Sequence, residues 1–284
     1  MKIYQFVPFY NENLVAKINL LESSKWIDEF HVTETNFTFQ GKEKNYNFNQ
    51  FEFSNLVYHK LDVSKDFLFD RKIIPHFFPK NNPKWHPNVF FKTSWYNEGI
   101  QRNLSCIKDL VSDEDIVILS DIDEIIDSRF AQRIIDEVKK RDVVTIKLHF
   151  SLFYLNLYST NWGGPENYSY RVFIVKGKVL KKWNFDYDTI RKSGERNLFS
   201  NQIYCIPEVC GFHHSWLGDK TAISNKLISY AHTEHNFLND IDYIQKCLTN
   251  KISIFPGHEL AADDSIMLLD SIKHNKGLFN DFII

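Results

Sequence analysis

The sequence predicts an α/β fold with a Rossmann-like, mostly parallel central sheet flanked by helices. The first observation is that short, β-branched apolar segments alternate with segments whose apolar residues recur at helical spacing. The second is the apolar run 116–119, which is followed at once by Asp121, Asp123 and Glu124. Such a run is typical of a buried strand whose carboxyl end opens on a cleft, where α/β sheets bind ligands.

The same periodicities predict the elements of the first half. A strand at 3–9 leads into a helix at 13–23, in which Leu14, Ile18 and Leu21 lie on one stripe. Further strands are predicted at 30–34 and 56–61, a proline-punctuated loop at 74–87, and helices at 92–110 and 129–140.

The second half has longer strands and fewer regular alternations. We predict strands at 143–154, 170–175 and 178–183, a turn at 162–165, and helices at 219–233 and 264–274. No linker-like or repeated stretch interrupts the chain, so 1–284 is expected to form a single domain. Its functional division is expected near Glu124.

Composition limits the classes of function. The chain has 284 residues, 43% of them hydrophobic, and a formal net charge of −2, which argues against general nucleic-acid binding. No apolar run approaches the roughly 20 residues of a transmembrane helix, and no signal-peptide pattern opens the chain. The cysteines form no metal-binding pair, so we expect a cytoplasmic or otherwise soluble protein with reduced thiols: Cys106, Cys205, Cys210 and Cys247.

Asp121 and Asp123 are the strongest candidates for a functional site. In an extended segment they point to the same side, and two such close carboxylates repel each other unless a cation or a proton intervenes. Carboxylate oxygens suit Mg²⁺ or Mn²⁺, ions that commonly bind phosphates. The alternative is that these acids cap the following helix, but Asp127 and Ser128 can perform that capping.

Several segments, in order along nearly the whole chain, carry a family resemblance. They are 8–12, 34–41, 98–103, 121–125 and 211–216, followed by Asn225, Lys226, Ser229, His232 and Glu234. Together they resemble glycosyltransferase family 17, the family of the bisecting N-acetylglucosaminyltransferase. The chain departs from the family pattern at Phe212, where Trp is usual, and at Asp219, where Gly is frequent.

This resemblance implies a GT-A-type fold and a role in glycan biosynthesis. The implied reaction is inverting, metal-dependent transfer of a sugar, possibly N-acetylglucosamine, from a UDP-linked donor to an oligosaccharide or glycoconjugate acceptor. The implied cofactor is Mn²⁺ or Mg²⁺. Residues 1–124 would form the nucleotide-sugar-binding half and residues 125–284 the acceptor-binding half.

Three residues are expected at the metal. Asp123 would coordinate the ion, and Asp121 would either share it or hold the donor's ribose. His213 would complete the metal shell or touch the diphosphate, because a neutral imidazole is an acceptable ligand for Mn²⁺. The alternative for His213 is a hydrogen-bonded core histidine.

Further residues are expected to bind the nucleotide. The segment after the first strand would meet the base, Glu34 the ribose or the uracil edge, and Arg102 and Lys226 the phosphates. The alternatives are that Phe9 packs in the core, Asn11 caps a helix and Arg102 forms a surface ion pair. The complete set is Pro8, Phe9, Asn11, Glu12, Glu34, Gln101, Arg102, Asp121 and Lys226.

An inverting transfer needs a general base for the acceptor hydroxyl. Glu166, beside the turn at 162–165, is the first candidate, and Glu234 and Asp186 are alternatives that the sequence does not rank. Trp162 and Trp216 are candidate stacking platforms for the acceptor sugar.

Two rival functions remain at this stage. A haloacid-dehalogenase-like phosphatase also places Asp-x-Asp at a strand end, but Glu124 and Ile125 stand where that class has a small residue and a hydroxyl. A non-catalytic nucleotide- or sugar-binding relative would be expected to lose the acids at 121 and 123, and both are present.

Overall fold

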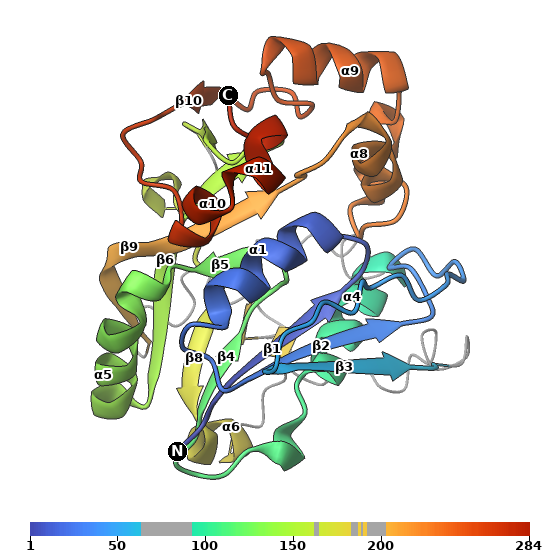
Figure 1. The fold of residues 1–284 in the computed structure, drawn as a ribbon. Helices are drawn as coiled ribbons and strands as arrows, with labels where there is room; N and C mark the ends of the chain where they lie inside the picture. The colour runs from blue at the N-terminus through green and yellow to red at the C-terminus, as the bar shows by residue number, and fades with distance from the viewer. Residues whose placement is uncertain (64–92, 162–164, 183–186, 189, 192–202) are drawn as a thin grey trace, which may run out of the picture.

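The computed structural model describes residues 1–63, 93–161, 165–182, 187–188, 190–191 and 203–284. The predicted loop at 74–87, together with Trp162 and Asp186, lies outside the described residues. Figure 1 shows an α/β molecule in which one large sheet runs through the centre.

The first half forms a parallel sheet in the order β3-β2-β1-β4. Side chains alternate along it: Ile3 and Val7 enter one core cluster, and Tyr4 and Phe6 enter another on the opposite face. Both faces are therefore buried, as the apolar runs predicted. The strands are β1 (Ile3–Phe9), β2 (Glu29–Thr35), β3 (Leu56–Leu61) and β4 (Ile116–Leu119).

Beyond β4 the sheet becomes mixed. The strand β8 pairs antiparallel with β4 and with β6, whereas β9 runs parallel to β6 and also pairs antiparallel with the short β5. Two small strands, β7 and β10, complete the far edge. The strands are β5 (Glu124–Ile126), β6 (Val143–Leu152), β7 (Leu157–Ser159), β8 (Phe173–Lys176), β9 (Tyr204–Ser215) and β10 (Leu260–Ala262).

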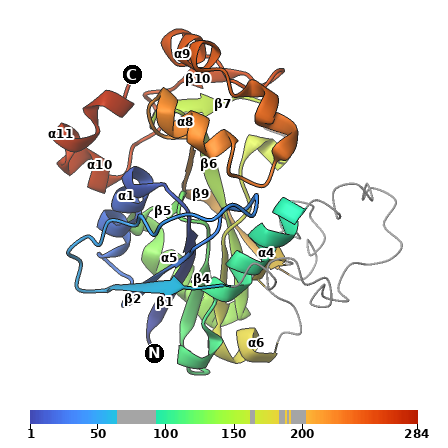
Figure 2. The same cartoon turned by 90° about the vertical axis from the view of Figure 1, so that its right-hand side faces the viewer.

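Helices cover the sheet on both faces. Figure 2 shows α1 and α4 on opposite sides of the parallel strands. In the part of the chain that the structure describes, no helix combines the length and apolar character needed to cross a membrane. The helices are α1 (Asn13–Ser23), α4 (Thr93–Ser105), α5 (Ala131–Arg141), α6 (Gly177–Lys182), α8 (Lys220–Leu227), α9 (Ile241–Asn250), α10 (Asp270–His274) and α11 (Lys276–Phe279).

Two predicted elements differ in kind or length for clear reasons. The segment predicted as a strand at 178–183 is helical through Lys182, in α6, and its last residue lies outside the described residues. The chain leaves β8 at Gly177, where a Cβ atom would lie 2.0 Å from the Ser112 carbonyl oxygen. The helix predicted at 219–233 ends at Leu227, because the Ser229 hydroxyl donates to the carbonyls of Asn225 and Lys226.

Two further predicted helices are shorter than expected. The helix predicted at 92–110 is α4, which ends at Ser105, and 108–110 form a separate 3₁₀ turn. The helix predicted at 264–274 begins only at Asp270.

Candidate active site

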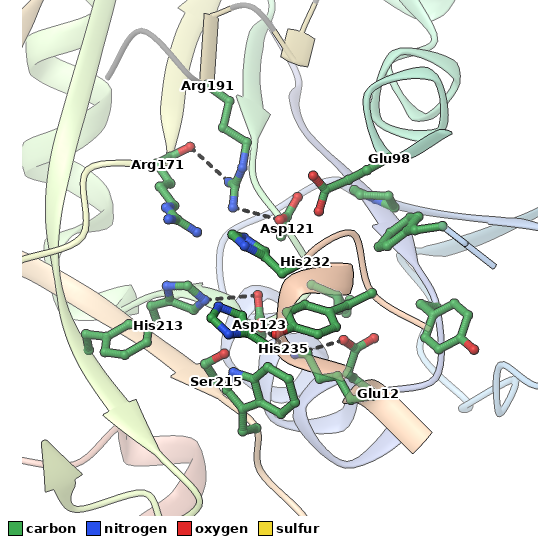
Figure 3. A pocket seen from close by; sticks show the side chains of 18 of the residues that line it. Glu12, Glu98, Asp121, Asp123, Arg171, Arg191, His213, Ser215, His232 and His235 are labelled. Carbon is green, nitrogen blue, oxygen red and sulfur yellow. Dashed lines mark hydrogen bonds and ion pairs between the residues drawn. The ribbon is translucent and has the colours of Figure 1, made fainter. Parts of the chain in front are cut away.

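A cavity of about 300 Å³ opens at the carboxyl ends of β1 and β4. Charged groups of both signs, several histidines and aromatic residues line it together, and Figure 3 shows the labelled acids, arginines and histidines. Its lining residues are Pro8, Tyr10, Glu12, Phe39, Glu98, Arg102, Asp121, Ile122, Asp123, Phe150, Arg171, Arg191, His213, Ser215, Trp216, Lys226, Tyr230, His232, His235, Phe255, Pro256 and His258.

Asp121 is held by two arginines. Arg102 donates from Nε to Oδ1 at 3.1 Å and from Nη2 to Oδ2 at 2.9 Å, and Arg191 Nη2 lies 2.7 Å from the same Oδ2. Burial alone would raise the pKa of this carboxyl, but the two guanidinium groups lower the pKa of Asp121 to about 2. Asp121 is therefore a fixed, permanently ionised anchor of the loop.

Glu124 extends this charge network behind the cavity. It is fully buried, accepts a hydrogen bond from the Asp121 backbone N–H at 2.8 Å, and lies 2.6 Å from Arg191 Nη1. Arg102 additionally contacts Glu98 at 3.1 Å and Asp188 at 2.9 Å. These contacts fix the backbone of the acidic loop, so the position of Asp123 is set by its neighbours.

Asp123 faces a different pair of partners. Lys226 Nζ lies 3.3 Å from Asp123 Oδ2 and 3.1 Å from Glu12 Oε1, and His213 Nε2 lies 3.5 Å from Asp123 Oδ1. Burial would raise the pKa of Asp123, but His213 and Lys226 hold it well below its usual range. Burial opposes the charge on Lys226, yet Glu12 and Asp123 raise the pKa of that ammonium above its ordinary value.

Only part of the predicted metal set suits a cation. Both oxygens of Asp121 already accept from guanidinium groups, so this carboxylate is poorly placed to coordinate an ion. The Asp123 and His213 atoms lie 3.5 Å apart, which is too far for a good hydrogen bond. Adjacent ligands of an octahedral ion with bonds of about 2.1 Å lie about 3.0 Å apart, so a small side-chain movement would let both atoms bind one ion. Asp123 and His213 therefore fit as two ligands of one cation, next to Lys226.

The structure brings seven of the predicted site residues to the cavity wall. They come from the ends of β1 and β4, from α4, β9 and α8, which are far apart in sequence. They are Pro8, Glu12, Arg102, Asp121, Asp123, His213 and Lys226.

Four predicted nucleotide-binding residues lie elsewhere. Phe9 is buried in the main core, and Asn11 is exposed beside a smaller pocket. Gln101 donates to the Phe37 carbonyl oxygen. Glu34 is fully buried, and its carboxylate pairs with Lys44. It also accepts hydrogen bonds from the Tyr58 hydroxyl and from the backbone N–H groups of Asn47 and Phe48.

Two of the candidate bases, Glu166 and Glu234, are not among the lining residues. Glu166 is exposed and pairs with Lys147 at 2.6 Å. Glu234 pairs with His232, a lining residue, at 2.9 Å. Asp186 lies outside the described residues.

Several lining residues carry no local sequence signal. Arg171 and Arg191 stand in segments without a recognisable motif, and His258 follows a turn. The aromatic wall is assembled by packing: Trp216 meets Tyr230 edge-on at 4.9 Å between ring centroids and Phe255 at 5.4 Å. Of these rings only Trp216 was expected at a sugar site.

The fold and this cavity fit an enzyme of the glycosyltransferase class, which the family match below establishes. An α/β sheet with helices on both faces presents paired acids at a strand end, next to cations and aromatic rings. The chain belongs to glycosyltransferase family 17, whose model matches residues 1–256. No curated protein matches the chain.

Solved structures show distant likeness. Mannose-6-phosphate isomerase from Helicobacter pylori is 13% identical, with 72% of this chain and 85% of that chain covered and a TM-score of 0.35. TarS residues 1–349 from S. aureus are 12% identical, with 88% and 72% covered and a TM-score of 0.36. The apo form of the glycosyltransferase GlyE from Streptococcus pneumoniae TIGR4 is 10% identical, with 72% and 44% covered and a TM-score of 0.32. The family match, and not these low scores, identifies the chain.

Proposed function

We propose that this glycosyltransferase moves a sugar, N-acetylglucosamine, from a UDP-linked donor to a glycan acceptor with inversion, assisted by Mn²⁺ or Mg²⁺. The observation that carries the proposal is the placement of Asp123 between His213 and Lys226 on the wall of the 300 Å³ cavity. This arrangement combines oxygen and nitrogen ligands for a cation with a fixed positive charge, which is what a departing diphosphate requires.

Asp123 and His213 would hold the ion, which when bound supplies Lewis-acid stabilisation of the leaving diphosphate. Lys226 supplies a second positive charge, which belongs to the protein. Its raised pKa keeps it charged at neutral pH, and its contacts with Glu12 and Asp123 fix the ammonium at the cavity wall. A diphosphate bound there would meet the Lys226 ammonium already in place, so the side chain would not have to move to stabilise the negative charge.

The aromatic wall suits a sugar ring. Trp216, Tyr230 and Phe255 line the cavity, with Lys226 Nζ 5.2 Å from the centroid of the Trp216 ring. Their flat faces and edges can pack against the apolar face of a pyranose. The general base stays unassigned among Glu166, Glu234 and Asp186, because Glu166 pairs with Lys147, Glu234 pairs with His232, and neither is a lining residue.

The test is a thermal-shift panel of nucleotides and nucleotide sugars, each with Mn²⁺ and with EDTA. A ligand that binds only the folded state stabilises it by about 2.7 kcal/mol when its concentration is 100 times the Kd. We expect UDP and UDP-N-acetylglucosamine to raise Tm with Mn²⁺ and much less with EDTA. An equal rise in EDTA would refute the metal-dependent mechanism, and a rise only with another nucleotide class would refute the UDP donor.

A further inference from the structure

A second group of potential metal ligands lies at the rim of the cavity. His232, Glu234 and His235 each offer one ligand atom, and these atoms all lie within 4.8 Å of one another. His232 Nδ1 is 2.9 Å from Glu234 Oε1. Both histidines line the cavity, and Figure 3 shows their rings directed into it.

Packing fixes the two imidazole rings. The Trp95 ring meets the His232 ring edge-on, with 4.3 Å between their centroids. The Tyr230 ring stacks on both imidazoles, with its centroid 5.3 Å from that of His232 and 6.3 Å from that of His235. Phe255 contacts His235 edge-on at 5.1 Å. The rings are therefore oriented by contacts that do not require an ion.

The backbone that carries these residues is tied to the first half of the chain. Ser94 Oγ donates to the Ala231 carbonyl oxygen at 2.7 Å, and Gln40 Nε2 donates to the Tyr230 carbonyl oxygen at 3.2 Å. Glu234 and His235 lie in one short 3₁₀ segment, η5 (Thr233–Leu238), and His232 immediately precedes it as its N-cap residue. Because the three ligands are so close in sequence, the local backbone geometry sets the distances between them. The two hydrogen bonds from Ser94 and Gln40 set how this segment is oriented toward the cavity.

We propose that His232, Glu234 and His235 bind a divalent transition-metal ion of the Zn²⁺ class. Two imidazoles and one carboxylate are the ligand set of open zinc sites, whereas Mg²⁺ prefers oxygen ligands. Three protein ligands leave at least one coordination position, and this position would face the cavity because both histidines line it. The ion would there hold a water or an oxygen of a bound ligand.

Only small side-chain movements are needed. Zinc–nitrogen bonds of about 2.0–2.1 Å place two ligand atoms of one ion about 3.4 Å apart in a tetrahedron. The Glu234 side chain is 40% exposed, so its torsions can adjust to that spacing while the two packed rings keep their orientation. This site is separate from the one proposed on Asp123 and His213, and it does not depend on the identity of the donor.

The test is calorimetric titration of the full chain with ZnCl₂ alone. The Asp123→Asn background removes the first site, so one remaining class of binding is expected. His235→Ala in that background should raise the Kd for Zn²⁺ at least about tenfold, because even outer-shell partners of a ligand are worth about 10- to 100-fold. His274→Ala, at an exposed histidine on α10, is the matched control and should leave the Kd unchanged.

Glu234→Gln keeps the size of the side chain but removes its charge, and it should also weaken Zn²⁺ binding about tenfold or more. Far-ultraviolet circular dichroism establishes that each variant is folded. Co²⁺ provides a second readout, since its visible absorption reports imidazole ligation and should be lost in His235→Ala. The proposal is overturned if both folded variants bind Zn²⁺ within twofold of their background, or if that background binds none.

Discussion

Asp121 and Asp123 stand two residues apart and face different partners. Asp121 is enclosed by Arg102 and Arg191, which stabilise the loop, whereas Asp123 meets Lys226 and His213 on the cavity wall. Alternation along an extended segment predicts that the two carboxylates share a side, but it does not predict which cations each one meets. The structural partners therefore separate an anchoring acid from a candidate ligand.

Asp121→Asn should destabilise the fold by about 3 kcal/mol, because it leaves two buried guanidinium groups without their shared counter-charge. Urea unfolding at neutral pH measures the loss. The control is Asp113→Asn, whose pair with Lys181 is exposed and should be worth at most about 0.5 kcal/mol. Equal effects of the two substitutions would contradict the anchoring role of Asp121.

Lys226→Met should weaken UDP binding about tenfold, because the fixed positive charge is lost while Glu12 and Asp123 remain to repel phosphate. The same substitution should leave Mn²⁺ binding in the absence of nucleotide unchanged or tighter, because the ammonium no longer competes for Asp123. Calorimetry with Mn²⁺ alone, then with UDP and Mn²⁺, separates the two effects. Lys220→Met, at an exposed position on the same helix, is the control. A parallel loss of both affinities would count against this assignment.

At the scale of single residues, the sequence predicts the acids and cations that belong to motifs or follow strand ends. Arg191 could not be predicted in this way. It is 1% exposed, and its partner Glu124 is 67 residues away in sequence, so nothing in its local segment indicates burial. Glu34 shows the converse: it lies near the carboxyl end of β2, where a site residue is expected, yet it is fully buried in a network with Lys44 and Tyr58.

At the scale of elements, β9 was not predicted although it supplies His213. Pro207, Glu208 and Gly211 interrupt its apolar pattern, and its register with β6 contains two irregularities. Its partner β5 is short and approaches closely at Gly211. β9 therefore lacks the short, uninterrupted apolar segment from which β1, β2 and β4 were predicted.

Gly211→Ala should destabilise the protein by about 3 kcal/mol, at the upper end of overpacking effects. A Cβ atom at this position would lie 2.1 Å from the Ile125 carbonyl oxygen, and backbone in a sheet cannot move away easily. Gly277→Ala is the control, since its Cβ would meet nothing within 4 Å, and it should be neutral or stabilising. Denaturant midpoints compare the two, and a tolerated Gly211→Ala would show that β5 and β9 can separate.

Glu22 joins α1 to two other elements. This buried carboxylate accepts from the Ser128 N–H at 2.9 Å, in η3 (Ser128–Phe130), and from the Ser271 N–H at 3.2 Å, in α10, and it pairs with Lys25 at 2.9 Å. Burial would raise the pKa of Glu22, but these hydrogen bonds lower it below its ordinary value of 4.5. Its stabilisation is thus complete above pH 4.5 and is lost as the pH falls from there through the lowered pKa.

Glu22→Gln should cost about 2 kcal/mol at pH 7, as expected for hydrogen bonds to a charged group. The difference from wild type should shrink below pH 4.5. There the wild-type carboxyl binds a proton more readily in the unfolded protein than in the folded protein, where its pKa is lowered, so the wild type loses stability. Unfolding free energies measured in urea between pH 7 and pH 3 test this. Glu114→Gln, at an exposed position, should give a small difference at every pH. A Glu22→Gln difference that stays constant with pH would contradict the prediction.

At the scale of the molecule, the cavity draws its wall from both halves of the sequence. Glu12 and Arg102 come from the first 124 residues, and Lys226 and His235 from the remainder. The core crosses the same division: the largest cluster of buried residues includes both Ile3 and Phe279. The acids could be predicted from local patterns, but the cavity that surrounds them depends on this pairing of distant segments.

The same continuity predicts cooperative unfolding. β6 places Ile146 and Leu148 in the largest core cluster and Phe150 and Leu152 in the second cluster, so one strand belongs to both cores. Loss of either core would expose apolar side chains of the other, and we expect one transition although chains of this length often populate intermediates. Tryptophan fluorescence and far-ultraviolet circular dichroism should give the same urea midpoint, and UDP with Mn²⁺ should shift both midpoints equally. Two separate midpoints would show instead that the second core, with α8 and α9, unfolds independently of the parallel sheet.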